Sequence, residues 1–391
     1  MKKMLVLSVA VMLLLSACAP NFGEEEELVQ ETDSDTKKKA IIPKYNISDQ
    51  YYKMVLPFEA GQARGLVADN LNTRLDIDEF ETGLMRIAQD TFSTEEYGFK
   101  EGQVLDAETI RSWLSRKKEG AALEEAKEKD KEFKNLGLNP PTSNAETAKA
   151  QSEESPIYLA HILEHNYFKR KNEETVEFGG VVLGLALNSV YYYNQEDGYP
   201  RQRPISDSEI RAEGEKIAAE VVKRVRAKKG MENIPIVIAM YKQAPKSSIV
   251  PGNFLTKAEV KPGQTNIGDW KNLNEEHHFF PSPEATKAYR DDASTFDRFK
   301  NEIDEFFPNY TGVIGKGFYK DGELQELKIE IPMQFYGKTE VIAFTQFVTG
   351  KIMEFFPDYL NIEVDIHSTG GPEALIVRKP NQEKPTVHIF E

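Results

Sequence analysis

The sequence repeats Glu305-Phe306-Phe307-Pro308-Asn309-Tyr310 as Glu354-Phe355-Phe356-Pro357-Asp358-Tyr359, 49 residues further along the chain. Proline cannot continue a helix, and it biases the residue before it toward extended backbone, so each copy should mark the end of a helix. Apolar residues recur at helical spacing before both copies. Before the first copy, one face is formed by Phe296, Phe299, Ile303 and Phe306. Before the second, a stripe of Ile342, Gln346, Thr349 and Met353 is flanked by Val341, Phe344, Val348, Ile352 and Phe355. The repeat therefore predicts two helices that end at matching positions.

Two strand-like segments follow each copy of the repeat. Residues 313–320 and 324–333 flank Asp321-Gly322, a pair that tolerates positive φ and suits a hairpin turn. Residues 362–367 and 374–378 flank a second glycine-containing turn. Helices that alternate with hairpins predict an α+β fold of two αββαββ-type units, with antiparallel or mixed sheets and helices packed on one face.

The preceding part of the chain carries a more diverged version of this pattern. Ser206 and Glu209 have the spacing of a capping box and predict a helix over 206–229. Asp76 is the candidate cap of a helix over 77–92. The other predicted elements are a helix at 157–168, a strand-rich segment at 175–193, and strands at 234–241 and 254–260.

These elements predict a chain of four parts. A signal peptide at 1–17 and a tether at 18–44 precede a first α+β domain at 45–280 and a second at 281–391. Within the first domain, residues 117–155 combine dense charge with stretches rich in Pro, Ser, Asn and Ala that lack periodicity. That composition indicates a flexible charged insertion.

The N-terminus has the features of a lipoprotein signal peptide. Lys2 and Lys3 precede an apolar run that ends at Ala17, and this run is too short for the ~20 residues that a membrane-spanning helix needs. Cys18, the only cysteine of the chain, directly follows small residues. We therefore expect prolipoprotein processing enzymes to attach diacylglycerol to the Cys18 thiol and to cleave between Ala17 and Cys18. The alternative is an ordinary signal peptide followed by an incidental cysteine.

The mature protein is expected at the outer face of the cell membrane, and its charge argues against binding to nucleic acid. Acylation of Cys18 anchors a protein without any transmembrane helix, and the acidic segment 18–44 is expected to be a disordered spacer. The chain has 64 Asp and Glu against 49 Lys and Arg, a formal charge of −15. That sign is wrong for a protein that binds nucleic acid.

One short motif could belong to a metal-dependent hydrolase. His161-Ile162-Leu163-Glu164-His165 would place His161 and His165 on one face of a helix, with Glu164 as a general base. No distal acidic ligand is evident, and an amphipathic helix packed in a core is the favoured interpretation. Glu275-Glu276-His277-His278 is expected to be a solvated loop, and no cofactor is predicted. Four acids that lack the spacing of a calcium loop are expected at a helix start: Asp76, Asp78, Glu79 and Glu81.

Longer segments are similar to a known family. They are the Cys18 lipobox, residues 155–165, the strand at 179–193, Val250-Pro251-Gly252-Asn253-Phe254, and residues 371–380. Together they resemble the CamS sex-pheromone precursor lipoproteins of Gram-positive bacteria. The resemblance implies a surface lipoprotein whose body has no established activity. It also implies that a short hydrophobic peptide, cut from the signal sequence, carries the pheromone activity.

By position, that peptide is Val11-Met12-Leu13-Leu14-Leu15-Ser16-Ala17. Such a peptide would bind a pheromone receptor by burying its apolar side chains. Three functions follow for the chain. The favoured one is a non-enzymatic pheromone-precursor lipoprotein, and the alternatives are a lipoprotein that binds a peptide or cell-envelope component and the metal-dependent hydrolase.

Overall fold

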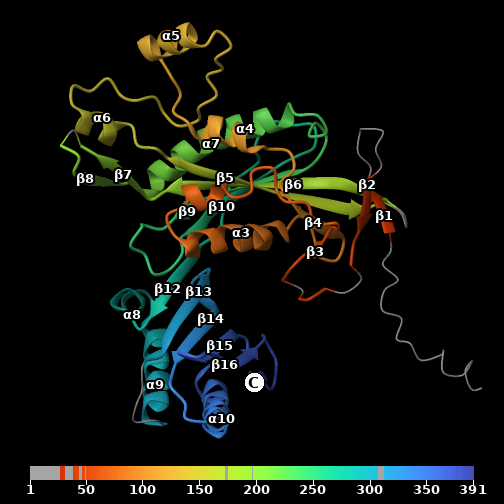
Figure 1. Cartoon of the computed structure of the whole chain (residues 1–391), viewed down its shortest axis with the longest axis vertical. Helices are drawn as coiled ribbons and strands as arrows, with labels where there is room; N and C mark the ends of the chain where they lie inside the picture. The colour runs from red at the N-terminus through yellow and green to blue at the C-terminus, as the bar shows by residue number, and fades with distance from the viewer. Residues whose placement is uncertain are drawn as a thin grey trace, which may run out of the picture.

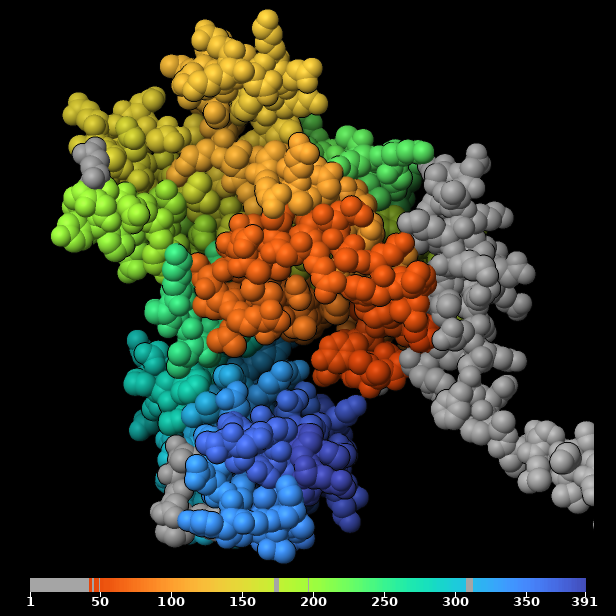
Figure 2. Space-filling view, viewed as in Figure 1, coloured from red at the N-terminus to blue at the C-terminus, as the bar shows by residue number. Residues whose placement is uncertain are grey.

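The computed structural model describes residues 27–30, 38–43, 46–48, 50–171, 175–195, 197–306 and 312–391. These residues form two lobes, each built on one sheet, with the C-terminal lobe below the larger N-terminal one (Figure 1, Figure 2). The α+β class and the mixed strand orientation agree with the prediction. Among the described residues, no helix is long and apolar enough to cross a membrane.

The N-terminal sheet has the strand order β11-β10-β9-β6-β5-β4-β3. Its strands are β3 (Lys53–Met54), β4 (Tyr97–Glu101), β5 (Leu159–Arg170), β6 (Thr175–Asn188), β9 (Ile236–Gln243), β10 (Asn253–Val260) and β11 (Lys271–Asn272). β6 pairs antiparallel with β5 and parallel with β9. Helix α7 (Asp207–Arg226) provides the crossover between these two parallel strands, and it starts with the predicted capping box of Ser206 and Glu209.

Helices cover both faces of this sheet. α7 and α4 (Ala107–Leu114) lie on one face, and α3 (Arg74–Ala88) lies on the other (Figure 1). Leu183 and Leu185 of β6 belong to the first core, whereas Val182 and Ala186 belong to the second. The prediction of helices on one face is wrong for this sheet, because a central strand with apolar residues on both sides must be covered on both.

The predicted helix at 157–168 is instead strand β5. Its pairing with β6 runs from Leu159 opposite Leu187 to Arg170 opposite Val176. Side chains of β5 are buried on both faces, so its apolar residues do not alternate cleanly and match helical spacing by coincidence. Sheet pairing therefore decides the conformation of this segment.

Helix α3 begins one turn earlier than predicted. Thr73 is its N-cap, and the Thr73 side chain accepts a hydrogen bond from the Asp76 N–H at 3.0 Å. Asp76, the predicted cap, lies in the first turn and is fully buried. Its carboxylate points toward the end of β9, where it accepts hydrogen bonds from Tyr241 and Ala244.

The C-terminal sheet has the order β12-β13-β14-β15-β16-β17. Its strands are β12 (Glu275–Phe280), β13 (Ile314–Lys320), β14 (Glu323–Pro332), β15 (Asn361–Ser368), β16 (Gly371–Arg378) and β17 (Thr386–Ile389). All neighbours are antiparallel except β14 and β15, which are parallel and are connected through α10 (Lys338–Phe355). Both predicted hairpins are present.

Two helices cover one face of this sheet, as the repeat predicts. α9 (Arg290–Phe306) and α10 end at Phe306 and Phe355, the second residues of the two copies. In α9 the predicted face of Phe296, Phe299 and Ile303 is buried. In α10 the predicted stripe is wrong, because Ile342 and Met353 are exposed and the flanking residues Val341, Phe344, Val348 and Ile352 face the core instead. Phe306 stacks on Phe347 at 4.5 Å between ring centroids, so the end of one helix packs on the side of the other. Residues 307–311 lie outside the described part of the chain.

The segment expected to be a solvated loop at 275–278 is instead part of strand β12. Glu275 is buried and pairs in register with Lys320 of β13. The second sheet thus begins before residue 281, because β12 supplies its first edge.

Short elements complete the fold. The charged insertion contains α5 (Gly120–Lys129) and α6 (Ala148–Glu154), which lie at the end of the molecule farthest from the C-terminal lobe (Figure 1). Buried Asn139 connects the insertion to α4 and β5, since its amide donates hydrogen bonds to the carbonyls of Leu114 and Leu159. The remaining elements are α2 (Leu66–Asn70), α8 (Pro283–Ala288) and the ribbon of β7 (Val190–Asn194) and β8 (Pro200–Pro204).

Two strands lie within the predicted tether. β1 (Glu27–Gln30) pairs antiparallel with β2 (Lys38–Ile41) and parallel with β6. At these residues the structure differs from the expected disordered spacer, because the backbone of β1 pairs with the N-terminal end of β6. For the residues of the tether that the structure does not describe, the disordered spacer stays a prediction.

Candidate functional site

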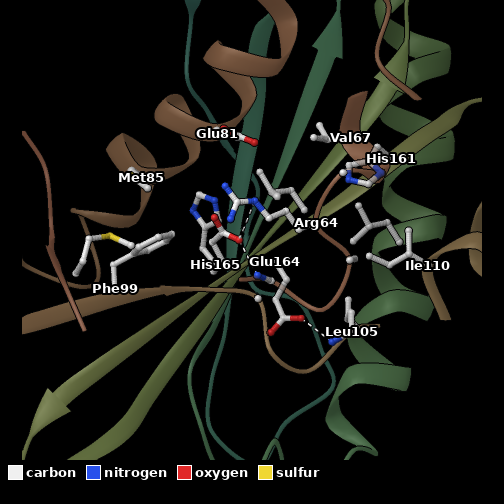
Figure 3. Close-up of a pocket in the computed structure, with 18 residues that line it drawn as sticks. Arg64, Val67, Glu81, Met85, Phe99, Leu105, Ile110, His161, Glu164 and His165 are labelled. Atoms are coloured by element: carbon white, nitrogen blue, oxygen red, sulfur yellow. Dashed lines mark hydrogen bonds and ion pairs between the residues drawn. The ribbon is translucent and has the colours of Figure 1, made fainter. Parts of the chain in front are cut away.

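A cavity of about 270 Å³ lies beside the N-terminal half of β5, where β4 no longer pairs with it (Figure 3). We call it the β5-edge cavity. β4 pairs with β5 only from His165 onward, so loops and helices cover the earlier residues of that strand. The lining residues are Met54, Gly61, Ala63, Arg64, Gly65, Val67, Glu81, Met85, Phe99, Glu101, Gly102, Leu105, Ile110 and the whole of His161-Ile162-Leu163-Glu164-His165.

The motif residues do not converge on a metal. In a strand, successive side chains point to opposite faces. His161 and His165 therefore lie on the α3 side, where they contact the rings of Phe80 and Phe99, and Glu164 points the other way (Figure 3). Within the described ranges, no three His, Cys, Asp or Glu side chains are grouped so that they could hold a metal ion.

The carboxylate of Glu164 accepts hydrogen bonds mainly from backbone N–H groups. It accepts hydrogen bonds from the N–H groups of Gln103, Val104 and Leu105, the last at 2.7 Å, and from the side-chain amide of Asn166 at 2.6 Å. Burial raises the pKa of Glu164, and these hydrogen bonds oppose that rise. Glu164 therefore shapes the 103–105 loop that forms one wall of the cavity, and it is not placed to act as a base for a metal-bound water.

Both histidines of the motif are neutral. Burial lowers the pKa of His161 to about 4 and the pKa of His165 to about 3. The amide nitrogen of Asn70 lies 3.2 Å from Nδ1 of His161. Since an amide NH₂ only donates, Nδ1 accepts and the proton of His161 resides on Nε2. Nδ1 of His165 is buried and has no hydrogen-bond partner among the residues that the structure describes.

Three charged side chains reach the cavity: Glu81 from α3, Arg64 from the turn before α2, and Glu101 from β4. Glu101 accepts a hydrogen bond from the Gly61 N–H at 2.6 Å, and its carboxylate lies 4.0 Å from Nε of Arg64. Glu81 of α3 is half-buried and forms no ion pair or hydrogen bond with any described residue. Burial raises the pKa of Glu81, the nearby Glu101 and Asp78 raise it further, and Arg74 and Arg64 oppose the rise. The cavity thus combines an apolar wall with two neutral imidazoles and one carboxylate that forms no ion pair or hydrogen bond with a described residue.

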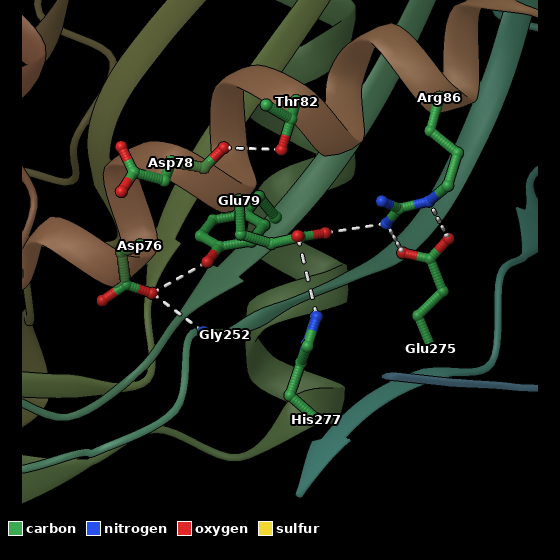
Figure 4. Close-up of polar contacts among 9 residues, drawn as sticks. Asp76, Asp78, Glu79, Thr82, Arg86, Gly252, Glu275 and His277 are labelled. Carbon is green, nitrogen blue, oxygen red and sulfur yellow. Dashed lines mark hydrogen bonds and ion pairs between the residues drawn. The ribbon is translucent and has the colours of Figure 1, made fainter. Parts of the chain in front are cut away.

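A second polar cluster joins the two lobes (Figure 4). Arg86 of α3 donates to Glu79 at 2.7 Å and to Glu275 of β12 at 2.9 Å. His277 of β12 lies 3.6 Å from Glu79 through Nε2. Burial lowers the pKa of His277 to about 4, so its ring is neutral. This cluster is a structural bridge, and it occupies the junction between the sheets.

The sequence marks the His161–His165 segment that lines the cavity but predicts it as a helix, and it does not indicate the charged residues that face it. Arg64, Glu81 and Glu101 lie far from His161 in sequence. The pairing of β4 with β5 brings Glu101 near, whereas Glu81 reaches the cavity from α3 and Arg64 from the turn before α2. No local motif marks them. Cys18 and the predicted peptide Val11–Ala17 lie outside the described residues.

Comparisons with known proteins agree on one family. The family model described as CamS sex pheromone cAM373 precursor matches residues 58–384. The chain is similar to the C-terminal domain of the sex pheromone staph-cAM373 precursor from Staphylococcus aureus, with 33% identity over 82% of this chain and 98% of that chain, and a TM-score of 0.72. It is also similar to a sex pheromone precursor from Lactobacillus salivarius subsp. salivarius, with 32% identity over 89% of this chain and 98% of that chain, and a TM-score of 0.78. No curated protein sequence matches the chain.

Proposed function

The chain belongs to the CamS sex pheromone cAM373 precursor family, and on that basis we propose that it is a lipoprotein that releases a short hydrophobic signalling peptide. The match over residues 58–384 is the observation that carries the proposal. The basic head, the apolar run and Ser16-Ala17-Cys18 support it independently. In this proposal, diacylglyceryl-modified Cys18 holds the folded body at the outer face of the cell membrane.

Anchoring depends on a single thiol. In a strain that expresses Cys18→Ala, we expect no acylation and no cleavage between residues 17 and 18, because the processing enzymes need the lipid-modified cysteine. Metabolic labelling with a fatty acid and the mass of the membrane-bound protein measure both steps. A Ser16→Ala variant keeps a small residue at the cleavage site and should be processed normally. A labelled, cleaved and membrane-retained Cys18→Ala protein would contradict the proposal.

The signalling activity is proposed to reside in Val11-Met12-Leu13-Leu14-Leu15-Ser16-Ala17. This peptide is released on the membrane side of the cleavage, while the chain from Cys18 onward stays anchored. It consists almost wholly of apolar side chains, and their burial in a receptor supplies the free energy of binding. The receptor is therefore expected to offer an enclosed apolar pocket.

Leu14→Ser is expected to weaken the response of recipient cells by about tenfold or more, because each lost methylene of burial is worth ~0.8 kcal/mol. The measurement is the mating-response titre of culture supernatants at matched lipoprotein levels. Leu7→Ser makes the same change in the same apolar run but outside the peptide, so it controls for effects on secretion. Equal titres from the Leu14 and Leu7 variants would place the activity elsewhere.

The folded body is proposed to be non-enzymatic. Two observations support this: Glu164 accepts backbone hydrogen bonds, and it points away from the face that carries His161 and His165, whereas the hydrolase alternative needs the three side chains to converge. The binding alternative is better supported than the hydrolase, because the β5-edge cavity offers an enclosed apolar space.

A further inference from the structure

We propose that the β5-edge cavity is a binding site for an aliphatic ammonium group, either a free alkylamine or the side chain of a lysine in a peptide. This inference goes beyond the release of a signalling peptide, and it stands whether or not Cys18 is acylated. Three features of the cavity carry it: its size and apolar wall, the Glu81 carboxylate that has no ion pair or hydrogen bond among the described residues, and the His165 imidazole that has no hydrogen bond there.

The size and wall select a short alkyl chain. The volume of about 270 Å³ lies just below the ~300–1,000 Å³ of most small-molecule sites. Met54, Met85 and Phe99 line the cavity together with Leu105 and Ile162. Thioether and aliphatic side chains adapt to a flexible chain at little cost. A whole peptide does not fit, but one extended side chain does.

The charge selects a cation. Glu101 is balanced by Arg64 at 4.0 Å and by the Gly61 N–H, whereas Glu81 has no ion pair or hydrogen bond within the described residues. Arg74 and Arg64 act on Glu81 without pairing with it, and the effect of each is smaller than that of the carboxylates Glu101 and Asp78. A half-buried carboxylate in such surroundings attracts a cation more strongly than an exposed one, because the local dielectric constant is lower. Figure 3 shows Glu81 at the α3 side of the cavity, across from the β5 residues.

The unpaired imidazole fits a ligand that only donates hydrogen bonds. His165 lines the cavity and is 3% exposed, and its ring forms no hydrogen bond in the described part of the chain; Nδ1 itself is fully buried. A neutral imidazole offers one lone pair, and an ammonium group carries three N–H donors and no acceptor. A carboxylate ligand would instead face the negative charge of Glu81 and could use only Arg64, which already lies near Glu101.

The test uses the full chain in phosphatidylcholine nanodiscs, with methyl-¹³C methionine and n-butylammonium as the probe. We expect saturable shifts of the Met54 and Met85 methyl signals, assigned from Met→Leu variants. n-Butyrate and n-butanol have chains of the same length and should not produce saturable shifts. Nα-acetyl-lysine N-methylamide tests the peptide source: binding comparable to that of butylammonium indicates a lysine side chain, and absence of binding indicates a free amine.

Two charge variants locate the interaction. Glu81→Gln should raise the Kd of butylammonium by about fivefold, whereas Asp78→Asn, on the exposed side of the same helix and paired with Arg74, should change it less than about twofold. Both variants should keep the wild-type thermal midpoint. The proposal is overturned if no probe saturates, if butyrate binds as tightly as butylammonium, or if the Glu81 and Asp78 variants behave alike. In the first case the cavity is a packing void only.

Discussion

Asp76→Ala is expected to lower the free energy of unfolding by about 4 kcal/mol, because it leaves several buried donors without an acceptor. The Asp76 carboxylate is fully buried. It accepts hydrogen bonds from the hydroxyl of Tyr241 at 2.8 Å and from the N–H groups of Ala244 and Gly252, both at 2.9 Å. Its second oxygen accepts from the Thr73 hydroxyl at 2.8 Å. One side chain thus joins the start of α3 to the end of β9 and to the turn that leads into β10.

Denaturant unfolding followed by circular dichroism measures this loss. Asp78→Ala is the matched control, since Asp78 lies on the same helix, is exposed and pairs only with Arg74 at the surface. Its cost should stay below about 1 kcal/mol. Asp76→Asn keeps one acceptor oxygen but adds a donor that has no acceptor there, so it should fall between the two. Equal midpoints for Asp76→Ala and wild type would show that Asp76 does not hold these elements together.

The C-terminal lobe could be predicted because its signals are local. The prolines of the two repeat copies, the helical spacing of residues such as Phe299 and Phe344, and the Asp321-Gly322 turn all act within a few residues. Local propensity and the final packing agree there for the ends of both helices and for the face of α9, whereas the stripe predicted for α10 includes Ile342 and Met353, which are exposed. The helix that starts at Ser206 was predicted for the same reason.

The errors occurred where pairing partners are far apart in sequence. β5 has apolar and polar residues that fit helical spacing, but β6 on one side and β4 on the other determine its conformation. Asp76 has the position of a helix cap, yet its partners Tyr241 and Gly252 follow more than 160 residues later. The sequence alone does not show which residues so far apart along the chain are in contact. The His161–His165 motif was therefore recognised but assigned the wrong geometry, and the facing residues Glu81 and Arg64 were not found.

The polar cluster between the lobes also joins residues that are far apart in sequence, and it provides the second prediction with a large expected effect. Arg86 is the only described cation between Glu79 and Glu275, as the hydrogen bonds in Figure 4 show. The side chain of Glu275 is only 1% exposed, and Arg86 also lies over the ring of Phe318 at 4.4 Å. Burial raises the pKa of Glu275, and Arg86 opposes that rise. Removal of Arg86 leaves a buried carboxylate without a paired cation, on which only the weaker effect of Lys320 is known to act.

Arg86→Met is expected to lower the free energy of unfolding by about 3 kcal/mol near pH 7, since it keeps most of the side-chain length but removes the charge. This loss of stability should become smaller toward about pH 4. Without Arg86 the pKa of Glu275 in the folded state rises further above its unfolded value, so the variant loses stability as the pH increases and regains it as Glu275 becomes protonated. Unfolding at both pH values, for wild type and variant, measures the difference.

A second substitution separates charge from packing. In a Glu275→Gln background the carboxylate is already neutral, so Arg86→Met should cost less than in wild type and should lose most of its pH dependence. Arg74→Met removes an exposed arginine that is paired with Asp78, and it should have little effect at either pH. If Arg86→Met costs the same at both pH values and in both backgrounds, then contact with Phe318 holds the lobes together and the buried ion pair does not.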